Sequence, residues 1–127
     1  MNSFEELEVW KECRQLKIYI SKLSKTFLSD EKYKLTDQII RSSRSVNANI
    51  SEGFGRFHFQ ENIQYCRQAR GSLFETLEHI YTAFDEQYID DTIVSEFKNK
   101  YEKCLKLLNG YIAYLLKVKA GNTDKSK

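Results

Sequence analysis

The sequence predicts an all-α fold, specifically an antiparallel up-down four-helix bundle with long helices. The 127 residues contain no proline and only five glycines, so little in the chain interrupts a helix. Apolar residues recur every three or four positions over most of the chain, which is the spacing of one helical face. The polar links between these segments are short, and short links join antiparallel neighbours. We expect one domain over residues 1–121 and a flexible C-terminal tail over 122–127.

The first helix is predicted to begin at Ser3, because Ser3 and Glu6 have the spacing of a capping box. Apolar residues then alternate at spacings of four and three as far as Phe27, which predicts a helix to about that residue. The residues of this seam are Val9, Cys13, Leu16, Ile20, Leu23 and Phe27. The helix would therefore present one continuous apolar stripe to its neighbours.

The second helix is predicted from about Asp30 to Gly53, and either Ser29 or Asp30 can cap its first turn. Its apolar stripe has a hydroxyl group in the middle, at Ser42 or Ser43, where a core position usually carries a larger apolar side chain. Small residues here predict close packing against the third helix. The alternative is a shallow floor under a binding surface.

The third helix is predicted to begin near residues 58–60 and to continue to Phe84. An acidic link over residues 85–91 follows it. The fourth helix is predicted to begin at Asp90 or Asp91, either of which can cap it, and to end near residues 120–121. No segment has the alternating pattern of a strand, so the four helices account for the whole predicted domain.

Charge is separated along the chain, although the net charge is only +2. Residues 11–70 carry twelve Lys and Arg against six Asp and Glu. Residues 71–97 carry seven acids and no Lys or Arg, whereas residues 98–127 carry eight Lys against two acids. Charge in such blocks creates a patterned surface field, which bears on partners more than on the fold.

Several classes of function are not supported by the sequence. The N-terminus has no basic head before an apolar run, and no window approaches the ~20 apolar residues of a membrane span, so we expect a cytoplasmic protein. An odd number of separated cysteines indicates reduced thiols, at Cys13, Cys66 and Cys104. Neither His58 nor His79 follows a glutamate at the spacing of a di-iron bundle, and no phosphate-binding loop is present. We therefore expect no metal, no cofactor and no catalytic residues.

Arg70 falls on the apolar seam of the third helix, where a guanidinium requires a partner because an unpaired buried charge is costly. The candidates are Glu52, near the end of the second helix, and Glu75 or Glu78 on the third. Such a pair would fix the register of the helices. Gly71, next to Arg70, is the glycine that we expect to bring the third helix close to the second.

Basic side chains and aromatic rings are interleaved in the middle of the chain. Phosphate contact and base stacking use this combination, so it predicts a surface that binds RNA. The candidate nucleic-acid-binding residues are Arg41, Arg44, Arg56 and Arg67, with Phe57, Phe59 and Tyr65 nearby. The alternative is an ordinary solvated face, since a net charge of +2 does not by itself indicate nucleic acid.

The chain resembles the four-helix-bundle proteins encoded in intervening sequences of 23S rRNA. The resemblance extends over about residues 3–118 and is carried by residues 4–10 (FEELEVW), 35–42 (LTDQIIRS), 45–56 (SVNANISEGFGR) and 69–75 (ARGSLFE). By these motifs the signature positions are Asn49, Glu52, Gly53, Arg56, Arg70, Gly71 and Glu75.

This resemblance implies a ring-like homopentamer with no established enzymatic activity. The chain is also similar to the accessory protein of diversity-generating retroelements, whose basic pentamer binds RNA and a reverse transcriptase. We therefore expect a non-enzymatic oligomeric module with possible RNA binding through its arginine face. The alternative is a protein-binding adaptor or scaffold with no role in nucleic-acid binding.

Overall fold

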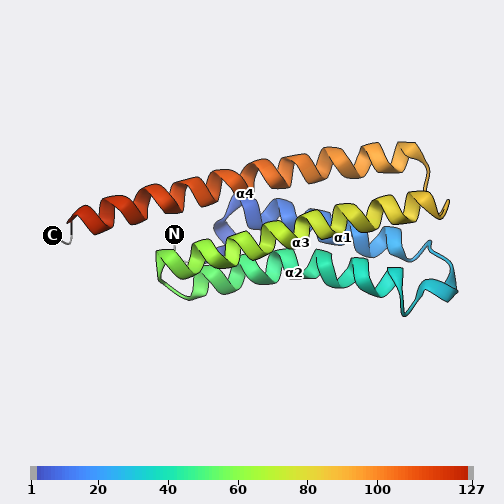
Figure 1. Cartoon of the computed structure of the whole chain (residues 1–127), viewed down its shortest axis with the longest axis horizontal. Coiled ribbons are helices and arrows are strands. Elements are labelled where there is room, and N and C mark those ends of the chain that lie inside the picture. The colour runs from blue at the N-terminus through green and yellow to red at the C-terminus, as the bar shows by residue number, and fades with distance from the viewer. Residues whose placement is uncertain (1–2, 126–127) are drawn as a thin grey trace.

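A computed structural model describes residues 3–125, with side chains to residue 121. Within this part the chain forms four α-helices and two short 3-10 helices, with no strand, which confirms the predicted all-α class. The helices run antiparallel to their chain neighbours (Figure 1). The elements are η1 (Phe4–Glu6), α1 (Glu8–Ser24), η2 (Ser29–Glu31), α2 (Leu35–Gly55), α3 (Phe59–Asp85) and α4 (Asp91–Lys125).

One hydrophobic core lies between the four helices. Each helix contributes a fully buried side chain to it, namely Ile20, Ile39, Ile63 and Phe97. Helix α4 continues through residues 122–125, where a tail is predicted, and residues 126–127 lie outside the described part. The division into a domain over 1–121 and a flexible tail stays a prediction.

The start of the first helix differs from the predicted start. The Ser3 hydroxyl accepts a hydrogen bond from the Glu5 N–H at 3.2 Å, so Ser3 caps η1 and not α1. Leu7 then adopts an extended conformation and its side chain is buried, which separates η1 from α1. Helix α1 ends at Ser24, three residues before the predicted end at Phe27. The capping residue was therefore predicted correctly, but it begins a different element.

The predicted start of the second helix at Asp30 is also wrong. A 3-10 helix occupies that position, and α2 begins at Leu35. The Glu31 carboxylate accepts a hydrogen bond from the Leu35 N–H at 3.1 Å and another from the Tyr88 hydroxyl at 3.1 Å. Glu31 thus caps α2 from a distance and also ties this turn to the link before α4. Helix α2 ends at Gly55, two residues later than predicted.

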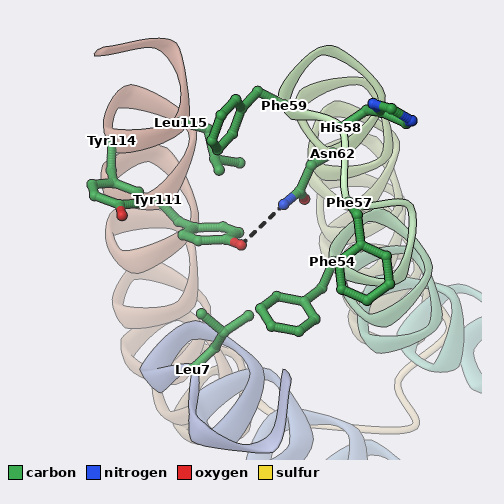
Figure 2. A pocket seen from close by; sticks show the side chains of 9 residues that line it. All are labelled: Leu7, Phe54, Phe57, His58, Phe59, Asn62, Tyr111, Tyr114 and Leu115. Carbon is green, nitrogen blue, oxygen red and sulfur yellow. Dashed lines mark hydrogen bonds between the residues drawn. The ribbon is translucent and has the colours of Figure 1, made fainter. Parts of the chain in front are cut away.

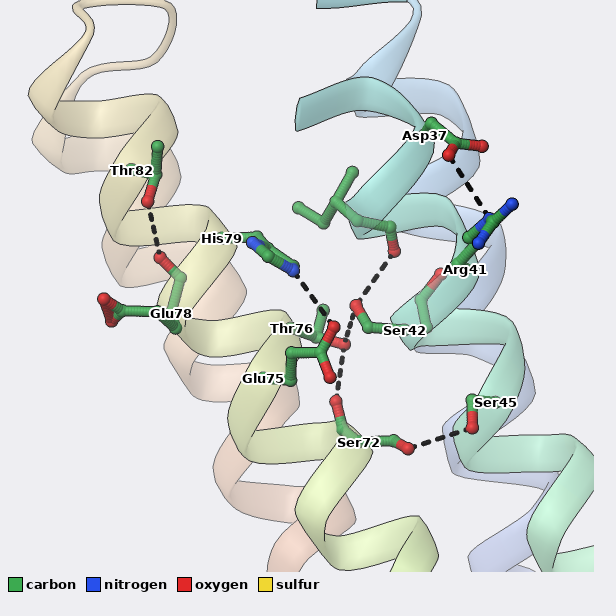
Figure 3. Close-up of polar contacts among 12 residues, drawn as sticks. Asp37, Arg41, Ser42, Ser45, Ser72, Glu75, Thr76, Glu78, His79 and Thr82 are labelled. Atoms are coloured by element: carbon green, nitrogen blue, oxygen red, sulfur yellow. Dashed lines mark hydrogen bonds and ion pairs between the residues drawn. The ribbon is translucent and has the colours of Figure 1, made fainter. Parts of the chain in front are cut away.

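Serine and threonine hydroxyls join α2 to α3 (Figure 3). The Ser42 and Thr76 hydroxyls are 2.8 Å apart in the core, and the Ser72 hydroxyl donates to the Ser45 hydroxyl at 2.9 Å. Each hydroxyl of this seam therefore has a partner, which removes the cost of burying it. The structure places the predicted small-residue contact between α2 and α3 at these residues.

The glycine that brings the two helices together is Gly53, not Gly71. A Cβ atom at Gly53 would lie 2.8 Å from both the Asn62 Oδ1 and the Tyr65 Cβ, closer than real Cβ contacts. A Cβ atom at Gly71 would have no atom within 4 Å. The predicted packing role of Gly71 is therefore wrong, because Gly71 faces outward.

Helix α4 is the longest element, with 35 residues against 27 in α3. Its last turns continue past the turn between α2 and α3 (Figure 1). Within the described residues, no helix combines the length and apolar character that crossing a membrane requires.

Candidate functional site

The four candidate arginines are all exposed on α2, α3 and the turn between them, but two of them are paired. The Arg41 Nε lies 3.2 Å from the Asp37 carboxylate on the same helix (Figure 3). Arg56 lies 3.7 Å from a Glu52 oxygen and 3.8 Å from a Glu61 oxygen. The positive charge of Arg41 and Arg56 is therefore largely balanced by neighbouring carboxylates.

Arg56 also binds Tyr65 in two ways. It donates a hydrogen bond to the Tyr65 hydroxyl at 2.7 Å, and its guanidinium lies 5.2 Å from the centre of that ring. Arg56 thus holds the end of α2 to α3. Arg44 and Arg67, in contrast, have no ion pair or hydrogen bond to a side chain of the described residues. Of the four predicted residues, these two present an uncompensated charge.

Arg70 does not lie in the core, so the prediction that it forms a buried pair with a glutamate is wrong. Its side chain is half-buried at the edge of α3 and donates to the Asn109 Oδ1 on α4 at 2.8 Å. Ala69 occupies the buried position instead. Glu75, one of the predicted partners, lies 3.2 Å from the His79 imidazole. Arg70 therefore connects α3 to α4 through a neutral amide.

The other signature positions do not converge on one place. The Asn49 amide donates to the Ser45 carbonyl and hydroxyl oxygens, which lie one turn earlier on the same helix. Glu52 is exposed beside Arg56, and Gly53 is buried against α3. These residues shape the α2–α3 contact and its exposed edge, and they do not form a single site.

The structure contains a cavity that the sequence did not indicate. It has a volume of about 510 Å³ and lies at the end of the bundle where α2 turns into α3. Figure 2 shows side chains from three distant segments around it. The inner walls are formed by Leu7, Phe54, Phe59, Asn62, Tyr111 and Leu115. In the sequence, Phe57 and Phe59 predict base stacking on RNA, and no pattern relates them to Leu7 or Tyr111.

The rim of the cavity carries exposed side chains. Phe57 has a backbone φ of 59°, in the left-handed region, and its side chain is 86% exposed. His58 is exposed beside it, and Tyr114 stacks on Tyr111 with their ring centres 6.3 Å apart. The opening is therefore ringed by aromatic groups on both sides.

A short chain of hydrogen bonds lies at the polar wall of the cavity. The Cys66 thiol donates to the Asn62 Oδ1 at 3.5 Å, and the Asn62 amide donates to the Tyr111 hydroxyl at 3.1 Å. Burial raises the pKa of Cys66 to about 12 and also raises the pKa of Tyr111. Both groups are consequently protonated at neutral pH. This wall offers hydrogen bonds, not acid–base chemistry.

Two common catalytic arrangements, a metal cluster and a nucleophile bound by His79, are not formed by the described residues. They contain no group of three or more His, Cys, Asp or Glu side chains that could hold a metal ion. The His79 imidazole is hydrogen-bonded to Glu75, but no hydroxyl or thiol of the described residues binds its other nitrogen. A nucleophile activated by a histidine therefore has no counterpart in this part of the chain.

Comparison with known proteins finds a solved structure with a similar fold and a matching family model. The crystal structure of a protein of unknown function from the S23 ribosomal protein family of Bacteroides thetaiotaomicron VPI-5482 is similar, with a TM-score of 0.76 and 24% identity. The match covers 83% of this chain and 95% of that chain. No match was found among curated proteins. The model of the 23S rRNA-intervening sequence protein family matches residues 5–110, so the chain belongs to that family.

Proposed function

We propose that this protein is a non-enzymatic assembly module that associates with copies of itself and binds RNA on its α2–α3 face. The observation that carries the self-association is a row of exposed aromatic side chains on α3. Phe74 is 51% exposed, Tyr81 is 37% exposed and Phe84 is 41% exposed. Exposed apolar surface of this kind is typical of interfaces.

The surroundings of this aromatic row favour another copy of the chain as its partner. The Phe74 ring lies 6.2 Å from the Tyr101 ring, so the row continues toward α4. Residues 71–97 carry acids and no Lys or Arg, whereas residues 98–127 carry eight Lys against two acids. An acidic face that meets the basic face of a neighbour is a heterologous contact, and such contacts form a ring when the rotation between copies closes. We expect the ring of five copies that the family resemblance implies.

Light scattering coupled to size-exclusion chromatography tests the assembly. The wild-type protein should elute at about five times the 15.0 kDa chain mass, and the double variant Phe74→Gln, Phe84→Gln should elute as a monomer. The matched control is Leu28→Gln, Tyr33→Gln, which removes two exposed apolar side chains outside this face and should keep the wild-type mass. A monomeric wild type in low and high salt overturns the self-association.

Two exposed arginines carry the proposal for RNA. Arg44 on α2 and Arg67 on α3 present guanidinium groups that no carboxylate of the described residues balances. Such groups can neutralise phosphates and release counterions, which makes the affinity fall with added salt.

Fluorescence anisotropy with a labelled RNA hairpin, measured over a range of salt concentrations, tests this surface. The variant Arg44→Gln, Arg67→Gln should bind more weakly and reduce the salt slope by about two. The variant Lys106→Gln, Lys117→Gln has the same charge change on exposed positions of α4 and serves as the control. No binding by the wild type at low salt overturns the RNA proposal. Recovery of a protein partner after nuclease treatment would then favour an adaptor.

A further inference from the structure

The cavity at the end of the bundle has the size and walls of a small-molecule site. Its volume of about 510 Å³ lies within the usual range for ligand pockets, which is roughly 300–1,000 Å³. It is lined by apolar residues from α4, from the α2–α3 turn and from the segment before α1. It lies at the end of the bundle, away from the α3 aromatic row and from Arg44.

The shape of the walls favours a flat ring. The Phe54 and Phe59 rings and the Leu7 and Leu115 side chains surround the space, as Figure 2 shows. Aromatic side chains bind other aromatic rings through offset or edge-to-face contacts, which suits a planar guest. The Tyr111 ring closes the remaining side, and Tyr114 stacks behind it.

The polar wall contains hydrogen-bond donors that have no acceptor among the described residues. The Tyr111 hydroxyl accepts a hydrogen bond from Asn62, and its own proton has no acceptor among the described residues. The Asn62 amide uses one of its two N–H groups for that bond, and its side chain is more than nine-tenths buried. A guest that supplies an oxygen or nitrogen acceptor could accept a hydrogen bond from one of these groups without displacing a protein partner.

Two backbone features keep this arrangement in place. The lack of a side chain at Gly53 allows Asn62 to approach α2 closely, because the Asn62 Oδ1 lies 2.8 Å from the place where a Cβ atom would stand. Phe57 adopts a left-handed backbone conformation that is costly for a bulky residue, and its ring stays 86% exposed at the rim. The chain thus keeps an aromatic side chain at the mouth of the cavity, where it does not fill the interior.

We propose that this cavity binds a small planar aromatic molecule that carries a hydrogen-bond acceptor, such as an aryl ketone. The ring of the guest lies between Phe54, Phe59 and Leu115. Its acceptor atom accepts a hydrogen bond from the Tyr111 hydroxyl. Phe57 covers the outer face of the bound ring.

A pair of probes that differ only in the acceptor tests the proposal. Fluorine NMR titrations would measure the affinity of the full chain for 4-fluoroacetophenone and for 1-ethyl-4-fluorobenzene. The ketone should bind the wild type more tightly. Tyr111→Phe should weaken ketone binding about fivefold and leave hydrocarbon binding unchanged, because it removes one hydrogen bond. Tyr33→Phe, at an exposed tyrosine outside both the cavity and the α3 aromatic row, is the control and should bind both probes like the wild type.

A second variant separates loss of binding from loss of folding. Phe59→Trp places a larger ring in the wall, so it should narrow the cavity and weaken the binding of both probes while the thermal unfolding transition remains cooperative. Equal affinity of the wild type for the two probes, or unchanged binding in Phe59→Trp, overturns the proposal. Dissociation of an oligomer on adding the ketone also overturns it, because a neighbour's side chain would then be the occupant.

Discussion

Two glycines of this chain, Gly53 and Gly71, differ in how closely the neighbouring helix approaches them. Gly53 is packed against α3 so closely that a Cβ atom would lie 2.8 Å from the Tyr65 Cβ and the Asn62 Oδ1, whereas a Cβ atom at Gly71 meets open space. Both residues are helical, and the family resemblance led us to expect both as signature positions. The atoms that face each glycine on the neighbouring helix decide which of the two makes the close α2–α3 contact. The periodicity of the sequence does not give the positions of those atoms.

Substitution of these glycines by alanine should therefore have opposite effects. Gly71→Ala should raise the free energy of unfolding by up to about 1 kcal/mol, because alanine favours the helix. Gly53→Ala has the same gain but forces α3 to move, and overpacking costs about 1–3 kcal/mol, so the net effect should be destabilising. Urea unfolding of the two variants measures the difference. Similar stabilisation by both would contradict the close approach at Gly53.

At the scale of the elements, the sequence predicts the number and type of helices and the starts of α3 and α4, but not the starts of α1 and α2. Residues Phe4–Glu6 and Ser29–Glu31 have helix-favouring composition, yet each forms a separate 3-10 helix. The pattern also placed Arg70 in the core where the structure places Ala69. A one-residue shift on a helix changes direction by about 100°, and a small alanine gives a weak apolar signal. Helix ends depend on contacts such as Glu31 with Tyr88, which link distant segments.

The remote cap on α2 gives a direct test at this scale. Glu31→Ala removes the acceptor of both the Leu35 N–H and the Tyr88 hydroxyl, so it should lower the free energy of unfolding by about 1–2 kcal/mol. Glu31→Gln keeps one acceptor oxygen and should recover part of this loss. Asp30→Ala changes a residue that the sequence predicted as a cap. It should change the free energy of unfolding by no more than about 0.5 kcal/mol. Equal effects of Asp30→Ala and Glu31→Ala in urea unfolding would refute the cap.

At the scale of the whole molecule, the cavity lay beyond sequence analysis because it is assembled from segments far apart in the chain. Leu7, Phe54 and Tyr111 line one space only because the antiparallel helices bring them to the same end of the bundle. The arginine face, in contrast, was partly predictable from the sequence. Its exposure and the Glu52–Arg56 pair, four residues apart on α2, follow from helical spacing, whereas the second carboxylate near Arg56 does not, since Glu61 lies beyond the turn.

The buried thiol and phenols predict how the stability of the molecule depends on pH. Burial raises the pKa of Cys66 from 9.0 to about 12 and also raises the pKa of Tyr111 and Tyr101. The unfolded chain loses these protons at lower pH than the folded chain, so stability is full below pH 9 and falls as the pH rises toward 12. The Cys66 contribution to this slope is about 1.4 kcal/mol per pH unit.

Urea unfolding between pH 7 and pH 11 would measure this dependence. The free energy of unfolding of the wild type should fall more steeply above pH 9 than that of Cys66→Ala. The two slopes should agree below pH 8, which controls for the general effect of the substitution. Parallel curves over the whole range would show that Cys66 does not ionise differently in the folded protein.

The length of α4 has a consequence for the timescale on which the cavity can exchange its contents. Tyr111, Tyr114 and Leu115 form one wall, and they precede the turns of α4 that extend beyond the start of α3 (Figure 1). Lys119, which donates a hydrogen bond to Gln60, ties this extension to α3. The turns beyond this contact project past the other helices (Figure 1), and such a helix end opens by local fraying at a small fraction of the free energy of global unfolding. Fraying of these turns would widen the existing mouth of the cavity, so exchange of its contents does not require the bundle to unfold.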